Sequence, residues 1–417
     1  MISVGMGSSK DEDSFKAGKE AAQLAVDEID GEPIFSIMFS SVKFDLEKLL
    51  EGVRSVIKGP LLGCSDAGEI TNDGVETGSV AVMSIKSDEM KVNLGLGENI
   101  GENARKAGQD AATSAISGIG EELKTASHIF IKTKSGGFTN VSPHSMIILP
   151  DALSGGGADV VRGVTDVLGL HFPIVGGSPG DDLQMKKTYE FLNDKIYSDA
   201  VVAALISTEL VTGFGVRHGW HPVGKPMTVT KSEGGRIIEI DGKPAIKAYE
   251  EFFGREISEK ALGREFACNS CGIPAWEGEY RLRWPIIKNE DGSIVCAAEI
   301  PENCVIRIMS GDEKSAIEAA KTAAEEAMMR AGEPEPDDIA ACIIFDCISR
   351  KQLLGRDADK EIDVIKSVIG KETPLIGFYT YGEQAPTFGA PAGFHNQTVV
   401  IYIISKITQG DMVTRSL

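Results

Sequence analysis

Apolar and polar positions along the chain predict short buried strands that alternate with amphipathic helices. Runs of four to six apolar, mostly β-branched residues predict three pairs of strands, at 35–39 and 80–85, at 146–149 and 201–206, and at 342–345 and 399–404. Between the members of each pair lies a segment of helical periodicity, at about 45–58, 159–169 and 357–370. Continuous apolar strands separated by helices indicate a layered α/β fold, with sheets flanked by helices.

The same pattern contains internal pseudo-repeats. A shift of 90 positions aligns Lys16-Ala17-Gly18 with Lys106-Ala107-Gly108, and it aligns the glycine-containing stretch 4–7 with 94–97. Each copy predicts a short strand, a glycine-rich turn and a helix with an alanine stripe. A third copy of the helix covers 319–327 and ends before Pro334. Small residues on such a stripe allow the helix to lie close against a sheet.

A second repeated element follows each of the three periodic helices. It occurs at 60–69, 173–181 and 374–383, and each copy contains a proline, apolar residues and two glycines, followed by an acidic residue. The first glycine lets the backbone leave a strand, and the second permits a positive φ that turns amide groups towards one point. The acidic residue (Glu69, Asp181 or Glu383) could accept hydrogen bonds from a ligand. Strand ends of this kind line ligand crevices, but a tight connection copied by duplication would look the same.

The segment at about 209–304 has a different character. Glycines such as Gly213 and Gly215 interrupt short strand-like runs, and 289–292 suits a hairpin turn. We therefore expect a β-rich segment here. The chain is expected to form two halves, 1–208 with two repeat units and 209–417 with the β-rich segment and the third unit.

Composition narrows the classes of partner. The formal net charge of the 417-residue chain is −20, which disfavours nucleic acid and anionic membranes as partners. Its seven cysteines are an odd number, which fits a reducing compartment, and the first residues do not read as a signal peptide. No apolar run is long enough to span a bilayer. The expected location is the cytoplasm.

Candidate chemistry outside the repeated bends is sparse. Four cysteines (Cys268, Cys271, Cys296 and Cys304) could bind zinc, but their spacing is loose and we predict no metal. Cys64 or Cys347 could act as a nucleophile, with Arg350 lowering the thiol pKa, yet no general base is fixed nearby and we expect no enzyme. Arg281 and Arg283 alternate on one predicted strand and could reach a ligand carboxylate or form surface ion pairs.

Two motifs resemble the hallmarks of a known family. The run Gly63-Cys64-Ser65-Asp66-Ala67-Gly68-Glu69-Ile70 resembles the N-terminal half of FIST domains. The run 377–383, followed by Phe394-His395-Asn396-Gln397-Thr398, resembles the C-terminal half. The runs 241–245 and 347–350 add to this resemblance, which covers essentially the whole chain.

The resemblance implies a sensory protein of intracellular signal transduction that binds a small molecule, with amino acids among the implied ligands. Some members of the family resemble haem-containing nitric oxide sensors, so haem is an alternative although we predict no cofactor. This chain carries no recognisable output segment, which implies a separate signalling partner. The expected ligand-binding residues are Cys64, Ser65, Asp66, Gly68, Glu69, Gly177, Ser178, Asp181, Cys347, Arg350, Tyr379, Tyr381, Gly382, Glu383, His395 and Asn396.

Overall fold

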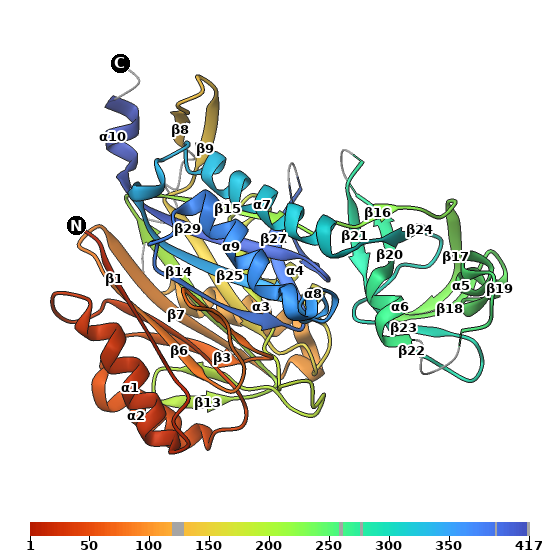
Figure 1. The fold of residues 1–417 in the computed structure, drawn as a ribbon, viewed down its shortest axis with the longest axis horizontal. Helices are drawn as coiled ribbons and strands as arrows, with labels where there is room; N and C mark the ends of the chain where they lie inside the picture. Colours follow the sequence, from red (N-terminus) through yellow and green to blue (C-terminus); the bar gives the residue numbers. More distant parts are fainter. Residues whose placement is uncertain (119–128, 258–261, 276–277, 388–389, 415–417) are drawn as a thin grey trace.

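The computed structural model describes residues 1–118, 129–257, 262–275, 278–387 and 390–414. It contains a main body of three sheets covered by helices and a smaller β-rich domain inserted into it (Figure 1). The predicted fold class, layered α/β with sheets flanked by helices and a β-rich segment, is confirmed.

The main body consists of three units with one topology. Each unit forms a four-stranded sheet with two helices on its outer face and a hairpin that leaves the sheet. The first unit comprises β1 (Ser3–Ser9), α1 (Ser14–Asp27), β2 (Phe35–Ser40), α2 (Leu46–Val56), β3 (Leu61–Ser65), the hairpin β4 (Glu69–Thr71) and β5 (Gly74–Val75), and β6 (Val80–Lys86). Its strand order is β1-β6-β2-β3, and only the β2–β3 pair is parallel.

The other two units repeat this order. The second has β7 (Met90–Glu98), α3 (Ile100–Ile116), β10 (His144–Pro150), α4 (Gly157–Leu168), β11 (Ile174–Gly177), β12 (Glu190–Leu192), β13 (Lys195–Tyr197) and β14 (Ala200–Thr208). The third has β15 (Leu210–Arg217), α7 (Glu313–Arg330), β25 (Ile339–Cys347), α8 (Ile348–Leu354), α9 (Ala358–Ile369), β26 (Leu375–Thr380), β27 (Glu383–Pro386), β28 (Ala392–His395) and β29 (Val399–Thr408). The additions to this plan are a projecting hairpin, β8 (Ile129–Lys132) and β9 (Phe138–Val141), the short helix α8 of the third unit, and the terminal helix α10 (Gln409–Thr414).

The units exchange their hairpins in a cycle. β4 of the first unit pairs with β26 of the third, β12 of the second pairs with β3 of the first, and β27 of the third pairs with β11 of the second. Each sheet is therefore completed by a neighbour, and the three sheets enclose one apolar core. In that core Phe378 lies 4.4 Å from Phe39 and 6.0 Å from Phe345, measured between ring centroids.

Each first strand lies directly against the alanine-rich helix that follows it. A Cβ atom added to Gly5, Gly95 or Gly213 would lie 2.1 Å from a helix carbonyl oxygen. These glycines were expected in a turn or in the β-rich segment, but they lie inside β1, β7 and β15. Their role is to let the helix backbone approach the strand, which a side chain would prevent.

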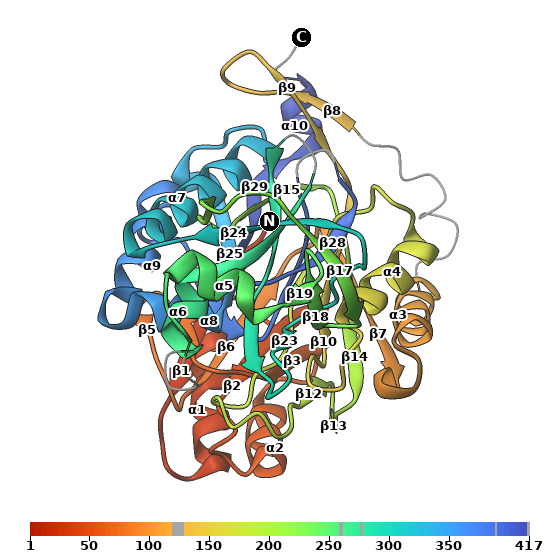
Figure 2. The ribbon, with the colours of Figure 1, turned by 90° about the vertical axis from the view of Figure 1, so that its right-hand side faces the viewer.

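The inserted domain separates β15 from α7. Its strands are β16 (His221–Pro222), β17 (Met227–Glu233), β18 (Arg236–Ile240), β19 (Lys243–Pro244), β20 (Asn269–Pro274), β21 (Tyr280–Arg283), β22 (Pro285–Lys288), β23 (Ile294–Cys296) and β24 (Val305–Ser310), with helices α5 (Ile246–Phe253) and α6 (Leu262–Cys268). The β-rich segment thus begins after β15 and ends with β24, later at both ends than the expected 209–304. Figure 2 shows this domain in front of one end of the main body.

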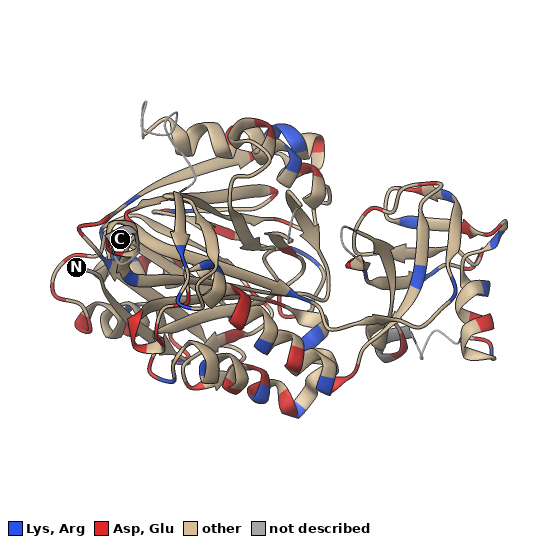
Figure 3. Cartoon of the chain, turned by 90° about the horizontal axis from the view of Figure 1, so that it is seen from above, with Lys and Arg blue, Asp and Glu red and all other residues tan. Residues whose placement is uncertain are grey.

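Charged residues lie mainly on the outer helices and on the inserted domain, whereas the strands of the main body contain few of them (Figure 3). Among the described residues, no helix combines the length and the apolar character that crossing a membrane requires.

The close contact of strand and helix predicts the effect of adding one methyl group. In Gly215→Ala the new Cβ would lie 1.8 Å from the Ala323 carbonyl oxygen, so strand and helix must separate. We expect a loss of about 3 kcal/mol in the free energy of unfolding, measured by urea denaturation. The control is Gly101→Ala on α3, whose Cβ would be 3.4 Å from its nearest neighbour and which should change stability by less than about 0.5 kcal/mol. Equal stability of the two variants would contradict the packing argument.

Candidate functional site

The three bends that follow β3, β11 and β26 meet at the end of the main body. Ala67 N donates to Tyr379 O at 3.1 Å, and Tyr379 N donates to Gly68 O at 2.8 Å. Ser178 N donates to Gly382 O at 2.7 Å, and Gly180 N donates to Ser65 O at 3.0 Å. Main-chain hydrogen bonds therefore join every pair of bends. This convergence results from the exchange of hairpins, because each bend leads its chain towards the neighbouring sheet.

The crevice expected between bends 63–70 and 377–383 is filled by protein. Ser65, Asp66, Glu69, Ser178 and Glu383 are fully buried, and they contact the neighbouring bends. The same tight packing explains why the spacing of the glycines repeats in the three bends. A Cβ at Gly382 would lie 2.1 Å from the Phe394 ring, and one at Gly177 would lie 2.4 Å from Thr380 Cγ2. Of the second glycines in the three bends, only Gly68 has a positive φ, so close approach, and not turn geometry, is the general requirement.

A buried glutamate begins each exchanged hairpin. Glu69 pairs with Phe378, Glu190 with Cys64 and Glu383 with Gly177, and these partners occupy equivalent positions in their strands. The third acid of the repeat is therefore Glu190, and the expected equivalence of Asp181 is wrong. The second unit has extra residues between its bend and its hairpin. Glu190 therefore lies farther from its bend than Glu69 and Glu383 lie from theirs, and the repeat spacing in the sequence does not identify it.

Burial sets the charge of these glutamates. Loss of hydration raises the pKa of Glu69, raises that of Glu190 well above its ordinary value, and raises that of Glu383 to about 8. Glu69 and Glu383 each accept one main-chain N–H at 3.1 Å, from Ser79 and Thr398. Neither carboxyl oxygen of Glu190 has a partner among the described residues. With a pKa of about 8, Glu383 is mostly protonated at neutral pH and can act as a hydrogen-bond donor.

Asp181 has a local structural role. Its carboxylate accepts hydrogen bonds from the N–H groups of Met185, Lys186 and Lys187 at 2.6 to 3.1 Å. It also accepts the Tyr381 hydroxyl at 2.6 Å. The side chain therefore holds the loop after the second bend to the third bend, and all its acceptor capacity is used.

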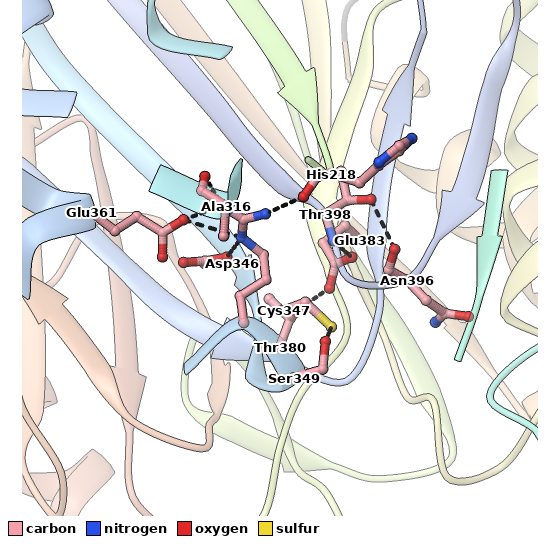
Figure 4. Close-up of polar contacts among 11 residues, drawn as sticks. His218, Ala316, Asp346, Cys347, Ser349, Glu361, Thr380, Glu383, Asn396 and Thr398 are labelled. Atoms are coloured by element: carbon pink, nitrogen blue, oxygen red, sulfur yellow. Dashed lines mark hydrogen bonds and ion pairs between the residues drawn. The ribbon is translucent and has the colours of Figure 1, made fainter. Parts of the chain in front are cut away.

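Arg350 is fully buried and is held by acidic side chains and main-chain carbonyl oxygens. Its Nε and Nη2 atoms donate to Glu361, its Nε lies 2.9 Å from Asp346 Oδ1, and its remaining donors reach the carbonyl oxygens of His218 and Ala316 (Figure 4). Protein acceptors thus bind four of its five N–H groups, and burial leaves no face of the guanidinium open to a ligand. It joins the inserted segment, α7, α9 and β25 at one point.

The two candidate nucleophiles are protonated thiols. Burial raises the pKa of Cys64 and of Cys347 well above the ordinary value, and the neighbouring Glu383 raises that of Cys347 further. The expected lowering of the Cys347 pKa by Arg350 is therefore wrong, because Asp346 and Glu361 already neutralise that cation. Ser349 Oγ donates to Cys347 Sγ at 3.1 Å, as Figure 4 shows.

A small cavity of about 20 Å³ lies where the inserted domain meets this end of the main body. Its walls come from β15, β21, the β27–β28 hairpin and the residue before β29, and consist of Val216, Arg217, His218, Ala275, Glu279, Tyr280, Arg281, Thr387, His395 and Thr398. The cavity is one hydrogen bond from Glu383, through Thr398 N. Of the expected ligand-binding residues, His395 lines it. We call it the junction cavity.

The motif 394–398 docks the inserted domain. Phe394 O accepts Arg283 Nη1 at 3.2 Å, and Gln397 Nε2 donates to Ala267 O at 2.7 Å while its Oε1 accepts the Ser270 hydroxyl. Gln397 adopts φ 57°, an uncommon value for a residue other than glycine. His395 Nε2 donates to Ala385 O at 2.9 Å, and burial lowers its pKa to about 3, so the imidazole is neutral.

The expected residues therefore divide into two groups. His395 lines the junction cavity, and Cys347, Glu383 and Asn396 hydrogen-bond to its wall residue Thr398, whereas Cys64, Asp66, Glu69 and Tyr379 lie in the packed interior among the bends. His218, Arg281 and Thr398 also line the cavity although the set of expected residues omits them. The inserted domain separates His218 from the motif 394–398 in the sequence, so no local pattern indicated that His218 belongs to the site. For Arg281, the alternation with Arg283 on one strand was such a pattern.

No group of three or more His, Cys, Asp or Glu side chains in the described part of the chain is arranged to hold a metal ion. In the described part of the chain, Cys268, Cys271, Cys296 and Cys304 form no disulfide bond, and burial raises the pKa of Cys271 and Cys296. Cys271 and Cys296 contribute to the apolar core of the inserted domain, against which Cys304 packs.

Comparison with known proteins gives distant matches. An uncharacterized protein of Methanocaldococcus jannaschii is 24% identical over 284 residues, which are 61% of this chain and 53% of that protein. An uncharacterized protein of Mycobacterium tuberculosis is 22% identical over 277 residues, 62% of this chain and 70% of that protein. The chain thus spans about half the length of the first of these relatives. Among solved structures, a cyanuric acid hydrolase matches with a TM-score of 0.38 and 9% identity, covering 98% of this chain and all of that one.

Family models account for most of the sequence. The FIST N domain model matches residues 34–243, and the FIST C domain model matches residues 245–386. The boundary between the two models falls inside the inserted domain, whereas the division expected near residue 208 falls between β14 and β15. That division stays a prediction. Since the two models together match well over half of the residues, the chain belongs to the FIST family.

Proposed function

We propose that this protein is a sensory protein of signal transduction that binds a small polar ligand at the junction cavity. FIST domains are generally proposed as small-ligand sensory domains. The observation that carries our proposal is a concentration of buried polar groups without protein partners beside the cavity. They include Arg281 Nε and His218 Nε2 in the cavity wall, and Asn396 Oδ1 of the residue that follows the wall residue His395. Buried polar atoms are nearly always hydrogen-bonded in folded proteins, so these groups require water or a ligand.

The position of the cavity suggests how binding is signalled. At about 20 Å³ the cavity holds about one water molecule, so a larger ligand must part the inserted domain from the main body. The hydrogen bonds of Gln397 and the Arg350 network lie along this junction. A ligand that binds the parted state more tightly shifts the population towards it, and a separate partner protein can recognise the new domain position.

Amino acids are the ligands to test first, in line with the resemblance to FIST domains. We expect one or more amino acids to raise the melting temperature of the wild-type protein and to lose this effect in His395→Ala, because that change removes a wall of the cavity. Differential scanning fluorimetry provides the measurement, and native mass spectrometry of freshly purified protein detects a retained ligand. His171→Ala, an exposed histidine away from the cavity, is the control. Absence of both a retained mass and any thermal shift would overturn the sensor proposal.

Haem does not fit the residues at this site. A porphyrin is far larger than the junction cavity, and His395 Nε2 already donates to a carbonyl oxygen. We therefore derive no step through haem. A Soret band in the freshly purified protein would contradict this view.

Thiol catalysis also lacks support in the geometry, because a nucleophile must reach its thiolate form. We expect iodoacetamide at neutral pH to leave Cys64 and Cys347 unmodified in the folded protein and to modify the half-exposed Cys304 first. Peptide mass spectrometry after timed quenching measures the order of alkylation. Rapid modification of Cys347 together with loss of a measurable turnover would favour an enzyme instead.

The raised pKa values predict how stability depends on pH. In the unfolded chain Glu383 has its ordinary pKa of 4.5, whereas in the folded protein its pKa is about 8. The folded state therefore binds more protons between these values. The stabilisation is fully present below about pH 4.5, falls by up to about 1.4 kcal/mol per pH unit, and is lost above about pH 8.

Between about pH 5 and pH 8 the unfolding free energy of the wild-type protein should fall as Glu383 loses its proton. In Glu383→Gln this fall should be smaller, because one titrating group is absent. Urea denaturation across this range measures the slope. Glu251→Gln, which removes an exposed carboxylate paired with Lys243, should keep the wild-type slope. An identical slope in Glu383→Gln and wild type would show that Glu383 is ionised in the folded protein.

A further inference from the structure

Arg281 is a largely buried cation without a partner among the described residues. It lies on β21 and lines the junction cavity, and its Nε atom is buried and makes no hydrogen bond. Other buried arginines among the described residues have acidic or carbonyl partners. Arg350 contacts Glu361 and Asp346, Arg283 donates to three carbonyl oxygens, and Arg217 forms an ion pair with Glu326. In a chain with 62 acidic and 42 basic residues, an unpaired buried cation is unexpected.

The surroundings of Arg281 leave its charge uncompensated. Glu299 is near enough to favour the cation, but its carboxylate is already paired with Arg162. Glu279 also lines the cavity, is exposed, and forms no ion pair with Arg281 in the described structure. Arg162 and Arg283 are further positive charges close by. The neighbouring His218 and His395 are neutral because burial lowers their pKa values to about 4 and about 3.

The backbone beside Arg281 is shaped to hold the guanidinium in place. A Cβ atom at Gly393 of β28 would lie 2.8 Å from Arg281 Nη2 and 3.1 Å from its Cζ. The side chain therefore lies against the β28 backbone, where any other residue would displace it. Gly393 thus gives Arg281 its position at the cavity wall.

We propose that Arg281 binds a carboxylate group of the ligand, held on the surface that Gly393 leaves open. This inference rests on the proposed function and names the chemistry of the ligand at that same site. A carboxylate is planar and matches the fork of a guanidinium with two parallel hydrogen bonds. A carboxylate is larger than the one water molecule that the cavity of about 20 Å³ holds, so it reaches Arg281 as the domains part and the rest of the ligand occupies the opened junction. A phosphate dianion is disfavoured because Glu279 stands at the same wall.

The test compares acids with their neutral amides. The probes are propionate with propionamide and L-leucine with L-leucinamide at millimolar concentration, with inorganic phosphate as a further probe, and saturation-transfer NMR measures binding to the full chain. We expect an acid to bind the wild-type protein about 10-fold or more tightly than its amide, since a charge-assisted pair is lost in the amide. Arg281→Gln should abolish this preference, Arg281→Lys should retain part of it, and Gly393→Ala should weaken acid binding.

The control is Arg236→Gln, which removes an arginine of the same inserted domain that pairs with Asp291 away from the cavity. It should keep the wild-type preference, and circular dichroism verifies that every variant is folded. Equal binding of acid and amide to wild type, an unchanged preference in Arg281→Gln, or tighter binding of phosphate would overturn the carboxylate inference and leave the sensor proposal standing. Failure of all probes to bind the wild-type protein would also overturn the carboxylate inference, whereas the sensor proposal falls only if no ligand mass is retained and no amino acid shifts the melting temperature.

Discussion

The exchange of hairpins between the three units is the constraint on which the rest of this structure depends. Each sheet lacks one edge until the hairpin of a neighbouring unit pairs with it, so no unit can satisfy its main-chain groups alone. The exchange forces the three bends together at one end of the body. It also carries a glutamate into the interior with each hairpin, because that residue begins the exchanged strand.

The cost of burying these carboxyl groups explains the chemistry of this end of the molecule. A buried carboxylate without a cation is unfavourable, and the chain meets this cost in two ways. Glu383 keeps its proton, whereas Asp346 and Glu361 share the guanidinium of Arg350. The inserted domain covers this polar end, and the junction cavity lies where its packing against the main body is incomplete. A ligand that enters there acts on the contact between two domains.

Close packing against the backbone at glycine positions is a second constraint on the fold. Gly5, Gly95 and Gly213 admit alanine-rich helices, and Gly382 admits the Phe394 ring. In the sequence the spacing of these glycines suggests turns, but in the structure most of them are needed because other groups pack too closely for a side chain. Gly393 has the same effect at the cavity wall, since it makes room for Arg281, whose Nε atom has no hydrogen-bond partner among the described residues.

Hydrophobic periodicity by itself determined the units, since strands buried on both faces and alanine-striped helices leave a strong local pattern. The strands at 35–39 and 342–345 and the helices that follow them were predictable for this reason, as were the motifs that resemble FIST domains. Tertiary structure alone decided that β15 completes the third unit, that Glu190 is the partner of Glu69 and Glu383, and that His218 and Arg281 meet His395. These contacts join residues far apart in the chain, and their pairing depends on sheet register and domain insertion, which no local pattern encodes.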